Sequence, residues 1–215
     1  MTESPNPAGP RLIALLVESS QPPLDPVLTQ SFETLLSLFL RWSARINLTA
    51  IRDQDGILSR HFVESIACAR ALPAGVSTLL DYGSGAGFPG IPIALCRPEI
   101  SVTMAESQGK KAAFLSEAVR VLKISAKVYS GRAEDLHAVY DCVTLRAVDK
   151  MDRAVQAATK LVRPGGWLAL LTTITALPAL KAAAGAEFSW TTVSLFPGND
   201  TRLLALGKHA INSPS

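Results

Sequence analysis

Residues 79–90 are the segment of this sequence whose types and spacing could most readily do chemistry. They read Leu-Leu-Asp-Tyr-Gly-Ser-Gly-Ala-Gly-Phe-Pro-Gly, an apolar run that ends in an aspartate and closely spaced glycines. Glycines adopt positive φ angles and place no Cβ between the backbone and a ligand. A strand entering such a loop, with a helix starting at Pro89 or Gly90, puts the loop where open α/β sheets bind ligands. The segment therefore predicts a ligand-binding turn, although glycine-rich turns also serve packing alone.

Two ligand classes fit the glycine spacing. Gly85, Gly87 and Gly90 satisfy GxGxxG, the dinucleotide fingerprint. Gly83, Gly85 and Gly87, preceded by Asp81, also satisfy D-x-G-x-G-x-G, the pattern of S-adenosylmethionine (SAM) methyltransferases. The carboxylate of Asp81 would repel a pyrophosphate and better suits the cationic methionine end of SAM. The chain also lacks a second mononucleotide-binding half for a nicotinamide, so SAM is favoured.

Charged residues follow the next three predicted strands. Glu106 ends the second strand about 20 residues after the loop, where an acid binds ribose hydroxyls in either ligand class. Arg132-Ala133-Glu134 follows the third strand, where a methyltransferase contacts the adenine, or else Glu134 or Asp135 caps the next helix. Arg146 ends the fourth strand, at the mouth where donor and substrate should meet. An arginine at a strand end is otherwise a surface charge.

The elements that must position these residues change character at residue 72. Before it, the pattern is helical, with a loose tail over residues 1–10 and a short helix over 12–18. Asp25 reads as an N-cap and Pro26 as the first residue of an amphipathic helix that reaches about Arg45. A further helical stretch covers residues 57–71. Residues 1–72 are therefore predicted to form an N-terminal helical extension.

From residue 73 short apolar runs alternate with helical patterns, which predicts βαβ units and a mostly parallel sheet. The predicted strands are 78–82, 101–105, 126–130, 142–145 and 167–172, and the predicted helices are 89–96, 110–122 and 152–162. A loop should follow the fifth strand up to residue 180. Two last strands, 191–195 and 202–206, are joined by a short turn-rich connection and should be antiparallel. The expected fold is α/β, a Rossmann-like class I SAM-dependent methyltransferase sheet over residues 73–215.

Composition narrows the class of protein. The 215 residues are 48% hydrophobic and 18% charged, which excludes a disordered chain. A net charge of +3 is too small for a protein that coats nucleic acid, but it allows a local basic face. Three cysteines without CxxC spacing predict reduced core residues and no metal site. With no signal peptide or spanning run, we expect a soluble cytoplasmic protein with no membrane association.

Several motifs resemble the RsmG (GidB) family, over about residues 39–166. They are Asn47-Leu48-Thr49, Arg60-His61-Phe62-Val63-Glu64-Ser65, the string G-x-G-x-G-F-P-G-I-P from Gly83, Glu106-Ser107 with Lys110-Lys111, Arg132-Ala133-Glu134 and Arg146-Ala147. The resemblance implies methyl transfer from SAM to N7 of one guanosine in the decoding-region loop of 16S ribosomal RNA, in the small ribosomal subunit. It places SAM contacts on Gly83, Phe88, Ala133, Glu134 and Arg146.

Asp81, Gly85 and Glu106 complete the predicted cofactor site, and Arg146 is the predicted catalytic residue. Guanine N7 has an in-plane lone pair and no proton, so its methylation needs in-line placement and no general base. In agreement, the fourth strand carries no N/D-P-P-Y/F box, and Cys142 lies on an apolar strand and reads as a core residue. The target should be an unstacked loop guanine, because an A-form duplex hides N7 in a deep, narrow groove.

Lys110 and Lys111, at the start of a helix beside the cofactor mouth, are predicted to contact RNA phosphates, together with Arg60 and His61. Alternatively, Lys110, Lys111 and Arg60 are ordinary solvated surface charges, and His61 is a packed residue or part of a lid. Two departures from the family concern places where RNA would be held. Residues 171–174 read Leu-Thr-Thr-Ile where the family has a Lys-Gly pair, and the C-terminal end lacks the family's extra basic residues.

No obligate protein partner is predicted. Two other functions stay open from sequence. One is a nicotinamide-dependent oxidoreductase that uses GxGxxG, and the other is a non-catalytic SAM-binding ribosome-assembly factor.

Overall fold

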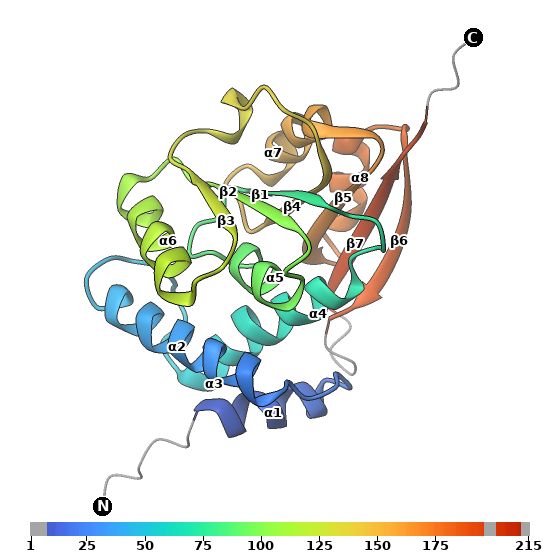
Figure 1. Ribbon diagram of the computed structural model, residues 1–215. Helices are drawn as coiled ribbons and strands as arrows, with labels where there is room; N and C mark the ends of the chain where they lie inside the picture. Colours follow the sequence, from blue (N-terminus) through green and yellow to red (C-terminus); the bar gives the residue numbers. More distant parts are fainter. Residues whose placement is uncertain (1–7, 196–200, 212–215) are drawn as a thin grey trace, which may run out of the picture.

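The computed structural model describes residues 8–195 and 201–211, and within them seven strands form one sheet with helices on both faces (Figure 1). The order is β3-β2-β1-β4-β5-β7-β6. The first five strands are parallel: β1 (Thr78–Tyr82), β2 (Ser101–Ala105), β3 (Ala126–Tyr129), β4 (Tyr140–Arg146) and β5 (Val162–Thr173). β7 (Arg202–His209) runs antiparallel between β5 and β6 (Phe188–Ser194). The predicted Rossmann-like sheet is confirmed.

The register of the sheet brings the predicted site residues together. Tyr82 lies opposite Ala105 of β2 and opposite Leu145 of β4. Because these strands are parallel, the residues that follow them leave the sheet at one level of its carboxyl edge. The glycine loop and Glu106 therefore start side by side.

The N-terminal part is helical, as predicted. It comprises α1 (Ala8–Glu18), α2 (Pro26–Ser43), α3 (Gln54–Ile57), a π-helical turn η1 (Leu58–Val63) and α4 (Glu64–Ala71). The Asp25 carboxylate accepts a hydrogen bond from the Leu28 N–H at 2.8 Å, which confirms the predicted N-cap. The predicted tail over residues 1–10 is wrong for its last three residues. α1 begins at Ala8 because the Gly9 N–H donates to Glu33 of α2 at 2.9 Å and Pro10 suits a first helical turn.

The remaining helices alternate with the strands. They are α5 (Gly90–Cys96), α6 (Gly109–Leu122), the 3₁₀ turn η2 (Ala133–Asp135), α7 (Met151–Ala158), the 3₁₀ turn η3 (Thr159–Leu161) and α8 (Leu177–Ala184). Helix α8 replaces the loop predicted after the fifth strand. Pro178 stands in the first turn, where a proline fits a helix, and alanines follow it. The predicted turn at residues 197–200 lies outside the described residues.

Two buried clusters cover the two faces of the sheet. One contains residues of α1, α2 and α4 together with α5, α6 and one sheet face, so the N-terminal helices share a core with the strands. The other lies under α7 and α8. The division of the chain into residues 1–72 and 73–215 stays a prediction. Cys68 and Cys142 are buried and Cys96 is partly buried, and in all three burial raises the pKa of the thiol. In the part of the chain that the structure describes, no helix has the length and apolar character needed to cross a membrane.

Candidate functional site

The glycine loop leaves β1 in a conformation that suits glycine. Gly83, Gly85 and Gly87 have φ angles of 66°, 55° and 81°, which other residues rarely adopt. Two backbone bonds close the turn, because the Ser84 N–H donates to the Ala105 carbonyl at 2.9 Å and the Gly87 N–H donates to the Ser84 carbonyl at 2.8 Å. Helix α5 then begins at Gly90, so the predicted strand, loop and helix are confirmed.

Asp81 lies beneath this loop and does not line the cavities above it. Only 1% of its surface is exposed. Its Oδ1 accepts a hydrogen bond from the Thr144 hydroxyl at 2.9 Å, and its Oδ2 accepts one from the Gly90 N–H at 3.2 Å. Burial raises the pKa of its carboxyl to about 6. The structure therefore does not bring Asp81 to the predicted contact with the methionine end of SAM; the carboxylate ties β1, β4 and α5 together.

Two adjoining cavities open at the carboxyl edge of the sheet, of about 450 and 440 Å³. Each has the size of a small-molecule site. Their common walls are Gly83, Glu106, Ser107, Val148 and Asp149. The two cavities thus adjoin at the glycine loop and together form the cleft at this edge of the sheet.

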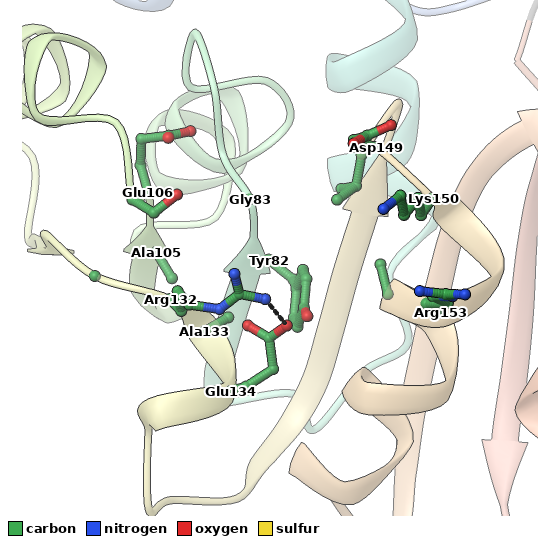
Figure 2. Close-up of a pocket in the computed structure, with 14 residues that line it drawn as sticks. Tyr82, Gly83, Ala105, Glu106, Arg132, Ala133, Glu134, Asp149, Lys150 and Arg153 are labelled. Carbon is green, nitrogen blue, oxygen red and sulfur yellow. Dashed lines mark hydrogen bonds and ion pairs between the residues drawn. The ribbon is translucent and has the colours of Figure 1, made fainter.

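Acidic and basic side chains face each other across the first cavity (Figure 2). Glu134 accepts a hydrogen bond from Arg132 Nη2 at 3.0 Å, and Tyr82 lines the same wall. Burial works to raise the pKa of Glu134, but the neighbouring Tyr82 and Arg132 outweigh it and lower the pKa. Ala133 is buried against the same wall, while Lys150 and Arg153 lie opposite. The predicted pair Ala133 and Glu134 is therefore in one cavity with Gly83 and presents an ionised acceptor.

Glu106 stands between the two cavities and holds the loop from above. The residue is 6% exposed, and its Oε2 accepts a hydrogen bond from the Gly85 N–H at 2.8 Å. Oε1 accepts one from the Gln108 N–H at 2.7 Å, directly before α6. Each carboxylate oxygen has a second lone pair, so Glu106 can still accept a ligand hydroxyl. The contact of Glu106 with a ribose stays a prediction.

The second cavity is built around an aromatic and cationic wall. The His61 ring stacks on Phe88 with centroids 5.1 Å apart and planes at 17°. Arg146 Nη2 donates to His61 Nδ1 at 3.0 Å. Because arginine only donates, Nδ1 accepts, and the Nε2–H of His61 donates to the Thr49 hydroxyl at 2.8 Å. Burial, helped by Arg146 and Arg60, lowers the pKa of His61 to about 3, so this imidazole is neutral.

The predicted catalytic residue Arg146 lines this cavity with a side chain only 10% exposed. The alternative that it is a surface charge is wrong. Burial lowers the pKa of its guanidinium to about 10, against the opposing effect of Glu64. Its Nη2 also donates to the Arg60 carbonyl at 2.6 Å. Strand β4 and the π-helical turn therefore fix this arginine between them.

The predicted RNA contacts separate into two groups. His61 and Lys111 line the second cavity, with Gly85 and Phe88. Lys110 is exposed and lies outside the lining of either cavity. The half-exposed side chain of Arg60 pairs with Glu64, its Nε 3.4 Å from Oε1.

Sequence reasoning missed residues that belong to this site. Asp149, Lys150 and Arg153 enter through the segment after β4, in which Lys150 has a φ of 49°. Glu64 stands within the Arg60–Ser65 motif, which could have marked it as a partner of nearby arginines. Arg202 is 138 residues from Glu64 along the chain, and no local pattern marks it.

Comparison with known proteins gives relatives over most of the chain. The family GidB, described as rRNA small subunit methyltransferase G, matches residues 28–194. A Ribosomal RNA small subunit methyltransferase G of Xanthomonas euvesicatoria pv. vesicatoria (strain 85-10) is 42% identical over 148 residues, 67% of this chain and 69% of the relative. A protein of the same name from Roseiflexus sp. (strain RS-1) is 43% identical over 132 residues, 58% of this chain and 56% of the relative.

Solved structures resemble the whole sheet. A cofactor-bound protein from MTB matches with a TM-score of 0.64 at 19% identity, over 98% of this chain and 100% of that chain. An O-methyltransferase from Bacillus cereus in complex with SAH matches with a TM-score of 0.56 at 15% identity, over 87% of this chain and 92% of that chain. At these identities the likeness shows the fold alone, which is that of class I methyltransferases.

Proposed function

Because this chain belongs to the GidB family of rRNA small subunit methyltransferases, we propose that it transfers a methyl group from SAM to N7 of a specific guanosine in 16S ribosomal RNA. The observation that carries the proposal is the pair of adjoining cavities at the glycine loop. Its first cavity offers the ionised acceptor Glu134, and its second cavity offers Arg146 and Lys111. The first cavity suits the nucleoside of SAM, and the second suits the methionine end of SAM beside an RNA base with its phosphate.

The residues of the cleft fit SAM. A Cβ at Gly85 would meet nothing closer than the Gly83 carbonyl oxygen at 3.9 Å, an ordinary van der Waals contact, so a ligand can come close to the backbone there. Glu106 and Glu134 supply acceptors for ribose hydroxyls and the exocyclic amine of an adenine. When bound, SAM supplies an electrophilic methyl group. We assign its contacts to Gly83, Gly85, Phe88, Glu106, Ala133, Glu134 and Arg146, and assign to Asp81 the support of the loop.

The chain's own task in the reaction is placement. Guanine N7 has no proton to lose, so in-line orientation is the main requirement. His61 is neutral and its Nδ1 already accepts from Arg146, so the imidazole serves orientation and not proton transfer. Arg146 is the residue we propose to orient the reacting groups, and guanine O6 is an acceptor that such a guanidinium binds. Lys111 would bind a neighbouring phosphate.

The decisive experiment is methyl transfer from labelled SAM to small ribosomal subunits isolated from a strain that lacks the enzyme. We expect one labelled guanine, with the label at N7. Label on another atom or base refutes the assignment of the substrate. SAM binding without transfer would favour the non-catalytic assembly factor.

Calorimetry with SAM and NAD separates the remaining alternative. We expect SAM to bind and NAD not to bind, and NAD binding alone would overturn the proposal. The relatives named above give the oxidoreductase no support. The small ribosomal subunit as partner, the lack of an obligate protein partner and the cytoplasmic location stay part of the proposal.

A further inference from the structure

Glu64, the first residue of α4, is a buried acid that neither the glycine loop nor the acceptor chemistry of the cleft uses. Its side chain is 4% exposed. It lies among three arginines that come from three elements: Arg60 of η1, Arg146 of β4 and Arg202 of β7. A buried carboxylate is expensive unless it is paired, so its partners define its role.

The three arginines contact Glu64 in different ways. Arg202 makes a two-bond fork, with Nε 2.5 Å from Oε1 and Nη2 2.8 Å from Oε2. Arg60 Nε lies 3.4 Å from Oε1. Arg146 Nη2 lies 3.7 Å from Oε2, within ion-pair range but beyond a hydrogen bond. Glu64 therefore offsets the charge of Arg146 without occupying its donors.

The donors of Arg146 are directed by the neighbouring turn. Its Nη2 donates to the Arg60 carbonyl and to His61 Nδ1, while its buried Nε has no hydrogen-bond partner among the described residues. The turn that supplies these acceptors is π-helical, and the Glu64 N–H donates to the Ser59 carbonyl five residues back. Such widened turns are frequent at functional sites. The turn thus supplies the two acceptors that orient Arg146, and Glu64 follows it directly.

The charge balance makes Glu64 necessary for this arrangement. Three guanidinium groups converge on one carboxylate, and the neighbouring His61 is neutral. Without the carboxylate, three like charges would repel one another at short range, and the buried guanidinium of Arg146 would have little water to screen it. Arg146 is the one of the three that lines this cavity. Repulsion would therefore displace the guanidinium at the cleft itself.

We propose that Glu64 is a positioning residue for methyl transfer, which acts through Arg146 while Arg202 fixes the Glu64 carboxylate. This inference rests on the proposed function. It assigns Glu64 and Arg202 no contact with donor or substrate. The loss caused by changing either one must therefore depend on Arg146.

A double-mutant cycle tests this dependence. Glu64→Gln should lower kcat/KM for methylation of small subunits by about tenfold or more, since a misplacement of about 1 Å costs up to 10²-fold. In an Arg146→Lys background the same change should cost less than about twofold, because the group it positions is already altered. Glu64→Asp, which keeps the charge, should recover part of the rate. Equal losses in both backgrounds would overturn the proposal.

Two further variants cover the chance that Glu64→Gln does not fold. Arg202→Lys keeps the charge but loses the fork, and its loss should also shrink in the Arg146→Lys background. Asp141→Asn is the matched control: its carboxylate also pairs with an arginine, Arg163, and lies near the amino ends of the strands. It should leave kcat/KM per folded molecule unchanged. If Asp141→Asn costs as much as Glu64→Gln, the effect is general destabilisation and the proposal fails.

Assays of the wild-type protein distinguish a failure of the proposed function from a failure of the positioning role. Absence of N7 label with the wild-type protein defeats the proposed function. Normal label with the wild type and with Glu64→Gln alike defeats only the positioning role.

Discussion

Gly85 and Gly87 are two residues apart in the loop. An alanine at Gly85 should mainly weaken SAM binding, whereas an alanine at Gly87 should mainly lower the stability of the fold. Both have positive φ, so either alanine costs about 1 to 2 kcal/mol of backbone strain. At Gly85 the added Cβ meets nothing closer than the Gly83 carbonyl at 3.9 Å. At Gly87 it would overlap Ile91 and lie 2.9 Å from Leu115 Cδ2. Overpacking of this kind adds about 1 to 3 kcal/mol.

The expected free energies of unfolding follow from these contacts. Gly85→Ala should lose about 1 kcal/mol, because the smaller unfolded-state entropy offsets part of the strain. Gly87→Ala should lose about 2 to 4 kcal/mol, since the same offset leaves about 1 kcal/mol of strain and overpacking adds about 1 to 3 kcal/mol. Gly85 lines the second cavity and Gly87 does not. Gly85→Ala should therefore weaken SAM binding tenfold or more, about 1.4 kcal/mol, while folded Gly87→Ala keeps most of its affinity.

Urea denaturation and calorimetric titration with SAM measure the two effects separately. The comparison is internal, because each variant is the control for the other. Unchanged SAM affinity in Gly85→Ala would show that the loop backbone is not approached by the ligand. Equal loss of stability in both variants would show that the contacts of Gly87 do not govern packing.

Three other outcomes follow from the acids of the structure. Glu134→Ala should weaken SAM binding about tenfold or more in calorimetry, because it removes an ionised acceptor that Arg132 holds in place. Unchanged affinity would mean that the acceptor lies elsewhere. The pKa of Asp81 is raised by burial from 3.8 to about 6, so its contribution to stability is full below pH 4 and is lost as pH rises through 6. The free energy of unfolding, measured relative to Asp81→Asn, should fall by about 3 kcal/mol between pH 4 and pH 7, and a difference independent of pH would refute this. Asp141→Ala should lower the free energy of unfolding in urea by about 1 to 3 kcal/mol above pH 4, because Oδ2 accepts hydrogen bonds from the Ser77 N–H and hydroxyl. The pKa of Asp141 is depressed, so this stabilisation should fade as the pH falls into the acid range. A variant as stable as the wild type would contradict the prediction.

The sheet was predictable from sequence because its signals are local. The strands β1 and β2 match their predicted bounds, and Gly90 opens α5 as the loop pattern indicated. Apolar runs bounded by turn residues carry this information in a few consecutive positions. Helix α8 was missed because Pro178 reads as a breaker when the start of the helix is unknown. Position within an element, which the sequence does not state, decides the meaning of a proline.

The site was predictable where it follows a strand end and unpredictable where it depends on distant pairing. Glu106, Glu134 and Arg146 are found in the cleft because the register of parallel strands brings their ends together. The fork between Glu64 and Arg202 joins residues 138 apart, and β7 reaches that place only because it inserts between β5 and β6. No pattern in one sequence contains that insertion.

Burial explains why the two acids predicted to contact the ligand, Asp81 and Glu106, have different roles. Asp81 accepts from the N–H of Gly90 below the loop, and Glu106 accepts from the N–H of Gly85 above it. Both carboxylates therefore hold the same loop, from opposite sides, before any ligand binds. Asp81 has no access to the cleft, whereas Glu106 lines both cavities and keeps lone pairs for a ligand. Glu106→Gln should accordingly weaken ligand binding and loosen the loop together, while Asp81→Asn should affect the loop alone.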